Sequence, residues 1–169
     1  DGGRCTVRVV HSLFTSTDEW DNQLEGWESG WPDFFRILRL YLTHFADEAC
    51  VPMQIQANSS EDRAKLWARV SEALGAVGLQ AGDTFGSASG APECRAHVEG
   101  TGSPAHPEEL LLRLEQPNPG LAHLFAMGMG EQTLLSIRVL WYGAQAEAIA
   151  AAQEPRWRAW LDGVSPPAN

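Results

Sequence analysis

The sequence is poor in positive charge. Lys65 is its only lysine, and 12 lysines and arginines stand against 22 aspartates and glutamates, for a formal net charge of −10. Such a chain is repelled by nucleic-acid phosphates and by anionic lipid. It also lacks an apolar run of membrane-spanning length and the basic region and apolar core of a signal peptide. We therefore expect a cytoplasmic protein that binds neither nucleic acid nor membrane.

Cysteine and histidine are too sparse and too scattered to build a metal site. Cys5, Cys50 and Cys94 are far apart with no C-x-x-C, so neither a disulfide framework nor a thiolate cage is indicated. The five histidines form no H-x-x-x-H pair; they are His11, His44, His97, His106 and His123. We predict no metal and no cofactor.

Two glycine-rich stretches resemble functional motifs but lack their context. In residues 86–90, neither serine stands midway between glycines in the way a nucleophile elbow requires. Residues 100–105 match the dinucleotide fingerprint, but Pro104 and Pro107 exclude the helix whose N-terminus would hold a pyrophosphate. Both stretches are predicted to be turns, and no catalytic residue is assigned.

With 44% hydrophobic and 20% charged residues, the chain has the composition of a globular protein. Residues 4–14 alternate in the period of a strand. Residues 16–19 then offer a capping box, and apolar side chains recur at helical spacing as far as Phe45. Because proline removes a backbone donor, we expect this helix to kink or restart at Pro32.

From Cys50 onward the pattern predicts a strand, a helix, five strands and a closing helix. A strand to Ala57 leads to a helix capped by Ser59 and Asp62 and ended by glycine near residues 75–78. The five strands form an antiparallel meander, and the closing helix is expected to break or kink at Pro155. These later elements are predicted at residues 83–89, 93–99, 109–115, 121–127, 133–142 and 144–161.

Three short stretches of the first predicted helix resemble a known family. Glu25-Gly26-Trp27, Gly30-Trp31-Pro32 and the run from Phe34 to Leu42 resemble the closing helix of SRPBCC (START/Bet v 1-like) domains. The resemblance is to the branch related to the activator of the heat-shock ATPase. It implies an α+β helix-grip fold, in which a curved antiparallel sheet wraps around a long C-terminal helix.

The resemblance also implies a division of the chain. Residues 1–46 look like the closing strand and helix of a preceding helix-grip unit, which fits a chain that starts at Asp1 without a methionine. Residues 50–164 look like a second, divergent unit, and residues 165–169 are expected to be a disordered tail. We therefore expect the C-terminal part of a tandem pair.

In the helix-grip fold the gap between sheet and closing helix can hold a hydrophobic molecule. Alternation places the candidate residues of the last two strands on shared strand faces, and helical spacing groups two tryptophans of the closing helix. The same residue types at these periods also suit a solid core, so both interpretations stay open. The candidate ligand-binding residues are His123, Phe125, Met127, Ile137, Val139, Trp141, Trp157 and Trp160.

The fold is shared by carriers, co-chaperones and cyclases, so it allows several functions. Our first hypothesis is non-catalytic binding of a small hydrophobic molecule in that gap. One alternative is a protein-interaction module without a ligand, acting on a protein partner or as a homodimer. Another is an aromatase/cyclase-like enzyme, which would need polar groups inside a hollow pocket.

Overall fold

The computed structural model describes residues 6, 8, 10, 21–103 and 106–165, and for residues 21–30 it describes the backbone alone. It divides the chain into two units, Asp1–His44 and Phe45–Asn169. Most of the predicted strand over residues 4–14 lies outside the described residues, as do residues 166–169 of the tail.

The first unit contains the helix α1, Asp21–His44. The helix includes Pro32, so the predicted restart at this residue does not occur. A proline inside a helix removes one backbone hydrogen bond, and the remaining turns keep theirs. The rings of Trp31, Phe34 and Phe35 lie 5.5 to 6.0 Å apart along one stretch of α1.

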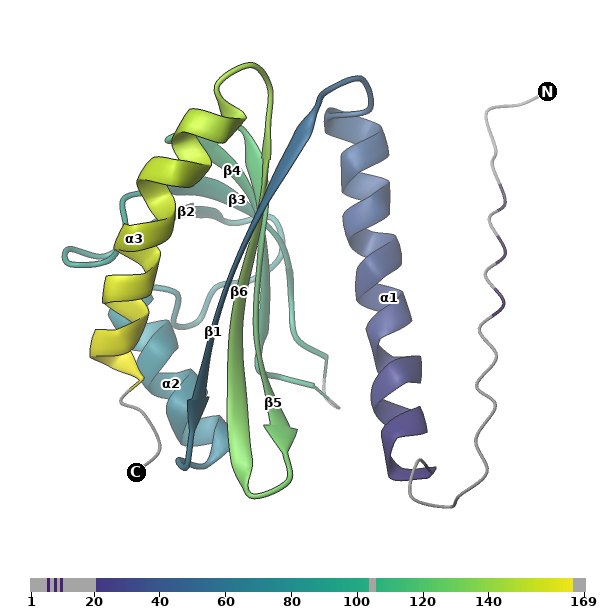
Figure 1. The fold of residues 1–169 in the computed structure, drawn as a ribbon, viewed down its shortest axis with the longest axis vertical. Coiled ribbons are helices and arrows are strands. Elements are labelled where there is room, and N and C mark those ends of the chain that lie inside the picture. The colour runs from purple at the N-terminus through teal and green to yellow at the C-terminus, as the bar shows by residue number, and fades with distance from the viewer. Residues whose placement is uncertain (1–5, 7, 9, 11–20, 104–105, 166–169) are drawn as a thin grey trace. The chain divides into compact units, whose positions relative to one another are not determined.

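The second unit is a six-stranded antiparallel sheet with two helices (Figure 1). The strand order is β1-β6-β5-β4-β3-β2, so β2 to β6 form the predicted meander and β1 pairs with the last strand. The elements are β1 Cys50–Ser59, α2 Arg63–Leu74, β2 Thr84–Gly86, β3 Arg95–Thr101, β4 Glu109–Gln116, β5 Gly120–Met129, β6 Gln132–Tyr142 and α3 Ala146–Val164.

Helix α2 begins and ends as the sequence predicts. The Asp62 side chain accepts hydrogen bonds from the amides of Ala64 and Lys65, which have no partner inside the helix. Gly75 ends the helix with a φ of 82°, a conformation that favours glycine. These two residues fix the helix between β1 and β2.

Both helices contribute to one core on the same side of the sheet. Leu66, Val70 and Leu74 of α2 are buried there, as are Trp157 and Leu161 of α3. The sheet side chains of this cluster include Met53, Ile55, Val98, Leu112, Leu124, Leu135 and Ile137. Figure 1 shows the layers of the second unit, with α2 and α3 against the sheet.

The closing helix α3 is also unbroken, although it contains Pro155. Its buried residues recur every three or four positions on both sides of this proline, which places them on one face of the helix. Burial of that continuous face offsets the hydrogen bond that the proline removes. The buried residues are Ala146, Ala150, Gln153, Trp157 and Leu161.

Leu66, Val70 and Leu74 form the buried face of α2. Leu66 is fully buried, whereas Trp67 is partly buried and packs at the border of the core. Val77 lies beyond the helix and is exposed. Residues 66, 70 and 74 are each four apart, so they follow the helical period.

Among the described residues, no helix combines the length and apolar character needed to cross a membrane.

Candidate functional site

The pairing of β5 with β6 decides which residues face the helices. Leu124 lies opposite Ile137 and Ala122 lies opposite Val139. Residues directly opposite each other in an antiparallel pair point to the same face of the sheet. All four belong to the core cluster together with residues of α2 and α3. We call this side of the sheet the inner face and the other side the outer face.

The register separates the eight residues predicted to line one cavity. His123 lies opposite Arg138, and Phe125 lies opposite Ser136, so these residues point to the outer face together with Met127. This corrects the expected grouping. The shared face of His123, Phe125 and Met127 follows from alternation within one strand, but only the register to β6 tells which face meets the helices.

The other five predicted residues do come together at the inner face. Ile137, Val139, Trp141 and Trp157 are at most 2% exposed, and Trp160 is partly buried against the same cluster. The rings of Trp157 and Trp160 make an edge-to-face contact at 5.6 Å. These large side chains belong to the core between the sheet and the helices.

Two polar atoms are buried in this apolar interior. Trp141 Nε1 and Gln153 Oε1 have no hydrogen-bond partner among the described residues. Such groups require an explanation, for instance an ordered water or a ligand. Gln153 was not among the predicted site residues. Its spacing from Ala150 and Trp157 on α3 is the signal that would have placed it inside.

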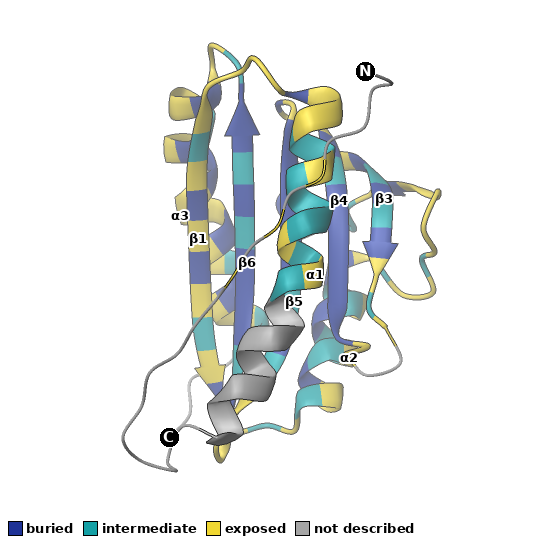
Figure 2. Cartoon of the chain, turned by 90° about the vertical axis from the view of Figure 1, so that its right-hand side faces the viewer, coloured by how far each residue is buried: buried dark blue, intermediate teal, exposed yellow. Residues whose placement is uncertain are grey.

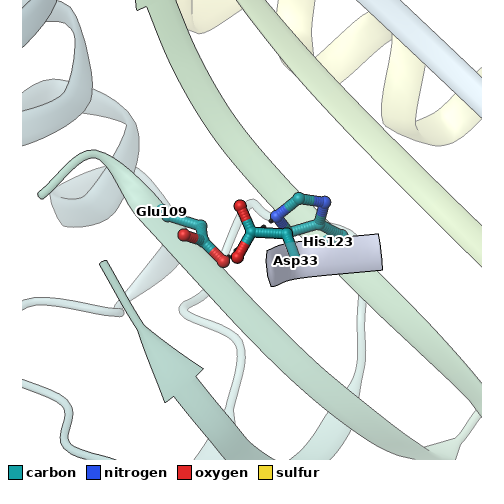
Figure 3. Close-up of side chains that lie close together, drawn as sticks. All are labelled: Asp33, Glu109 and His123. Atoms are coloured by element: carbon teal, nitrogen blue, oxygen red, sulfur yellow. Dashed lines mark hydrogen bonds and ion pairs between the residues drawn. The ribbon is translucent and has the colours of Figure 1, made fainter. Parts of the chain in front are cut away.

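The outer face carries a histidine and a carboxylate. His123 on β5 and Glu109 on β4 are both buried, and His123 Nε2 lies 3.2 Å from Glu109 Oε1 (Figure 3). The His123 ring also packs against Phe125 at 5.0 Å. His123 Nδ1 has no partner among the described residues. A carboxylate in this position fixes the orientation of the imidazole.

Within the second unit, this pair supplies one imidazole and one carboxylate. A histidine base needs a nucleophile within hydrogen-bond reach, but the hydroxyl of the nearby Ser136 is buried and has no partner among the described residues. His123 Nε2 and Glu109 Oε1 are joined by a hydrogen bond or ion pair.

A hollow of about 260 Å³ lies at the opposite end of the sheet from β1. Phe85 is its buried apolar residue, and Arg95 and Glu115 are exposed charged residues at its rim. The hollow is lined by Thr84, Phe85, Gly86, Arg95, Ala96 and Glu115. It therefore belongs to the β2–β3 edge and not to the gap between the sheet and α3.

The two cysteines in the described part of the chain are free. Burial raises the pKa of the Cys94 thiol to about 11, although contacts with Ser87 oppose this. Burial likewise raises the pKa of the exposed Cys50, and a hydrogen bond with Tyr142 lowers it. Neither thiol is activated as a nucleophile, because activation needs a lowered pKa.

No family model matches the sequence, and no curated protein matches it either. Solved structures do match its fold. CalU16 from Micromonospora echinospora has a TM-score of 0.54 and 14% identity, over 70% of this chain and 81% of that one. A polyketide-cyclase-like protein from Corynebacterium glutamicum has a TM-score of 0.48 and 12% identity, over 70% and 91% of the two chains.

The Aha1 dimer from Colwellia psychrerythraea has a TM-score of 0.47 and 11% identity, over 70% of this chain and 97% of that one. Of these three matches, CalU16 alone exceeds a TM-score of 0.5, and at 14% identity the similarity is one of fold. Together with the six-stranded antiparallel sheet and the long closing helix, it shows that this chain has an α+β helix-grip fold.

Proposed function

We propose that this protein is a non-catalytic interaction module, a helix-grip domain that binds a polypeptide partner through its surface. The alternative of a carrier requires a cavity of about 300 Å³ or more between the sheet and the closing helix. We keep the expected cytoplasmic location as part of the proposal.

The filled inner face is the observation that supports this proposal. Trp141, Trp157 and Leu161 are at most 2% exposed and lie where the ligand of a carrier would bind. Protein interiors of this kind are close-packed, so a ligand would have to displace them. The enzyme alternative loses its support as well, because the imidazole of His123 points to the outer face.

Ala150→Phe tests the interior directly. Ala150 is buried on α3, so added bulk in a filled interior should destabilise the fold by about 1–3 kcal/mol. The matched control is Ala152→Phe on the same helix, where the residue is exposed and the change should cost little. The measurements are denaturant unfolding and titration with an apolar fluorescent dye. We expect no saturable dye binding.

The result that contradicts the proposal is equally specific. A hollow interior would bind about one equivalent of dye and would raise the melting temperature by mass action. In that case Ala150→Phe would remain stable and lose the dye. A polypeptide partner isolated with the wild-type protein should still bind Ala150→Phe, because the interior plays no part in that contact.

A small hydrophobic ligand with a polar group is the second candidate function. It is favoured by the unpartnered atoms Trp141 Nε1 and Gln153 Oε1, which such a ligand could satisfy. Gln153→Leu separates the two functions. Without a ligand, removal of an unsatisfied polar group should leave stability unchanged or raise it. With a ligand, the variant should bind dye or ligand more weakly than the wild type.

We also propose that residues 1–46 close a preceding helix-grip unit. The proposal rests on the resemblance of α1 to such a closing helix and on its aromatic group of Trp31, Phe34 and Phe35. Because the sheet and its core lie within the second unit, residues 45–169 should fold alone. Cooperative unfolding of that fragment, followed by near-UV circular dichroism, tests the division. A fragment without fixed tertiary structure would contradict it.

A further inference from the structure

The two edges of the sheet differ in length. Strand β2 at one edge has three residues, whereas β1 at the other edge has ten. A short edge strand offers few backbone groups to another chain, but a long one presents a row of unpaired amides and carbonyls. Figure 2 shows β1 as the outermost strand, with exposed and buried residues alternating along it.

The hairpin between β5 and β6 shows which backbone groups of β1 point outward. Met129 lies opposite Gln132 across a two-residue turn at Gly130, whose φ is 64°. Such a turn is closed by a hydrogen-bonded pair, so even-numbered residues of β6 bond to β5 and odd-numbered ones bond to β1. Since Ile137 lies opposite Ile55, the odd-numbered residues of β1 bond to β6.

The even-numbered residues of β1 therefore direct their amides and carbonyls away from the sheet. Pro52 agrees with this assignment, because a proline has no amide to give to β6 and is tolerated where that amide would point outward. The outward row consists of Cys50, Pro52, Gln54, Gln56 and Asn58, and each of them is exposed. Among the described residues, no backbone hydrogen bond from this row to another element occurs.

The row also lacks the usual protection of an edge strand. Natural edges are blocked by charged side chains, especially lysine, or by proline. The ten residues of β1 contain no charged side chain, although 20% of the chain is charged. Pro52 blocks the beginning of the strand, which leaves Gln54, Gln56 and Asn58 open.

We propose that β1 pairs with β1 of a second copy of this chain, antiparallel about a twofold axis at Gln56, to form one continuous sheet. In this register Gln54 lies opposite Asn58 of the other copy, and each opposed pair can exchange two backbone hydrogen bonds. Pro52 then lies opposite Ser60, beyond the end of the partner strand, so its missing amide costs nothing.

A second copy fits this row better than a foreign strand because the row is complementary to itself. The opposed side chains are all uncharged amides, which can hydrogen-bond to each other across the pair. The register with Gln54 on the axis would place Pro52 opposite Gln56 and would leave a carbonyl unpaired on each side. This pairing does not depend on the proposed function, since a ligand carrier could associate in the same way.

Association should be weak and should respond to salt in a characteristic direction. One pair of edge strands buries less surface than a standard interface, so dissociation constants of roughly 10 µM to 1 mM are expected. Each copy has a formal net charge of −10, and the two repel each other. Salt screens that repulsion, so association should strengthen from about 0.05 M to 0.5 M salt. Association through an interface of ion pairs would instead weaken as salt is added.

Sedimentation equilibrium of the full chain and of Gln56→Lys tests the register. Two lysines would face each other across the axis, so the dissociation constant should rise about tenfold. Gln132→Lys is the matched control, because it adds the same charge at an exposed glutamine of β6, away from the edge. Gln56→Pro removes the outward amide without a change in charge and should also weaken association. Near-UV circular dichroism checks that each variant is folded.

A covalent trap gives an independent measurement. Residues in a hydrogen-bonded pair have Cα atoms about 5.5 Å apart, which a disulfide can span. In a Cys50→Ser background, Gln56→Cys should form a disulfide-linked dimer on mild oxidation, whereas Gln132→Cys should not. The products are read on a non-reducing gel.

Two outcomes would overturn the proposal. A monomer at all concentrations up to about 1 mM, in both low and high salt, would mean that the edge does not pair. Association that Gln56→Lys and Gln56→Pro leave unchanged would assign self-association to another surface. The dye experiments on the interior are unaffected by either outcome, so failure here is distinguishable from failure of the proposed function.

Discussion

The two faces of the sheet in the second unit carry different side chains, although they alternate along the same strands. On the inner face, β4 contributes Leu110, Leu112 and Leu114 to the core. On the outer face, the same strand carries Glu109, the half-buried Arg113 and the buried Leu111. Two acid–base pairs link polar groups of the outer face within the sheet, Glu109 with His123 and Glu99 with Arg113, whereas the inner face is almost entirely apolar.

This difference between the faces bears on where a ligand could bind. The inner face provides the packing that holds the fold together, and its space is occupied by tryptophan and leucine side chains. On the outer face, Glu109–His123 and Glu99–Arg113 form hydrogen bonds or ion pairs. Substitutions of core residues on the inner face should therefore change stability strongly, and those of the partly exposed pair Glu99 and Arg113 on the outer face weakly.

Trp157→Ala should have the largest effect. The side chain is 2% exposed within the core, and removal of a buried aromatic costs about 3–5 kcal/mol. Denaturant unfolding measures the change. Trp160→Ala on the same helix is the control, and it should cost clearly less because Trp160 is only partly buried. Equal costs for the two variants would contradict the assignment of the inner face.

Leu66→Ala should come next, with a loss of about 2–5 kcal/mol, because Leu66 is fully buried in the core cluster. Trp67→Ala should cost less, although the side chain it removes is larger. Trp67 lies at the border of the core and keeps part of its surface in water. If Trp67→Ala proved the more destabilising variant, the orientation of α2 would be wrong.

The sequence predicts the order and type of the elements well because local signals mark their ends. Asp62 and Gly75 define α2, and Gly130 marks the turn that joins β5 to β6. It predicts interruptions less well. Pro155 does not break α3, because the buried face of the helix continues on both sides of it, and that burial is not visible from the proline itself.

The candidate site was less predictable for a related reason. Alternation correctly groups His123 with Phe125, but it cannot tell which face of β5 meets the closing helix. The pairing of Leu124 with Ile137 supplies that information, and register is a long-range property. Gln153 could have been found from helical spacing alone, since it lies three residues after Ala150 and four before Trp157.

Cys94 offers a smaller, pH-dependent test of the inner face. Burial raises the pKa of its thiol to about 11, above its ordinary value. The thiol therefore contributes stability that is fully present below about pH 9 and is lost as pH rises toward about 11, amounting to about 2–3 kcal/mol. Unfolding free energies measured across this range should fall more steeply for the wild type than for Cys94→Ala. Parallel curves would mean that the thiol is not buried.

Disruption of the ion pair between Arg113 and Glu99 on the outer face should have the smallest effect on the free energy of unfolding. Arg113 Nε donates to Glu99 Oε1 at 2.6 Å, but both side chains keep about a quarter of their surface in water. Solvent screening reduces such a pair to about 0–1 kcal/mol. A double-mutant cycle with Arg113→Ala and Glu99→Ala measures the coupling energy at low and high salt. A coupling near that of a buried core contact, unaffected by salt, would show that the outer face is as closed as the inner one.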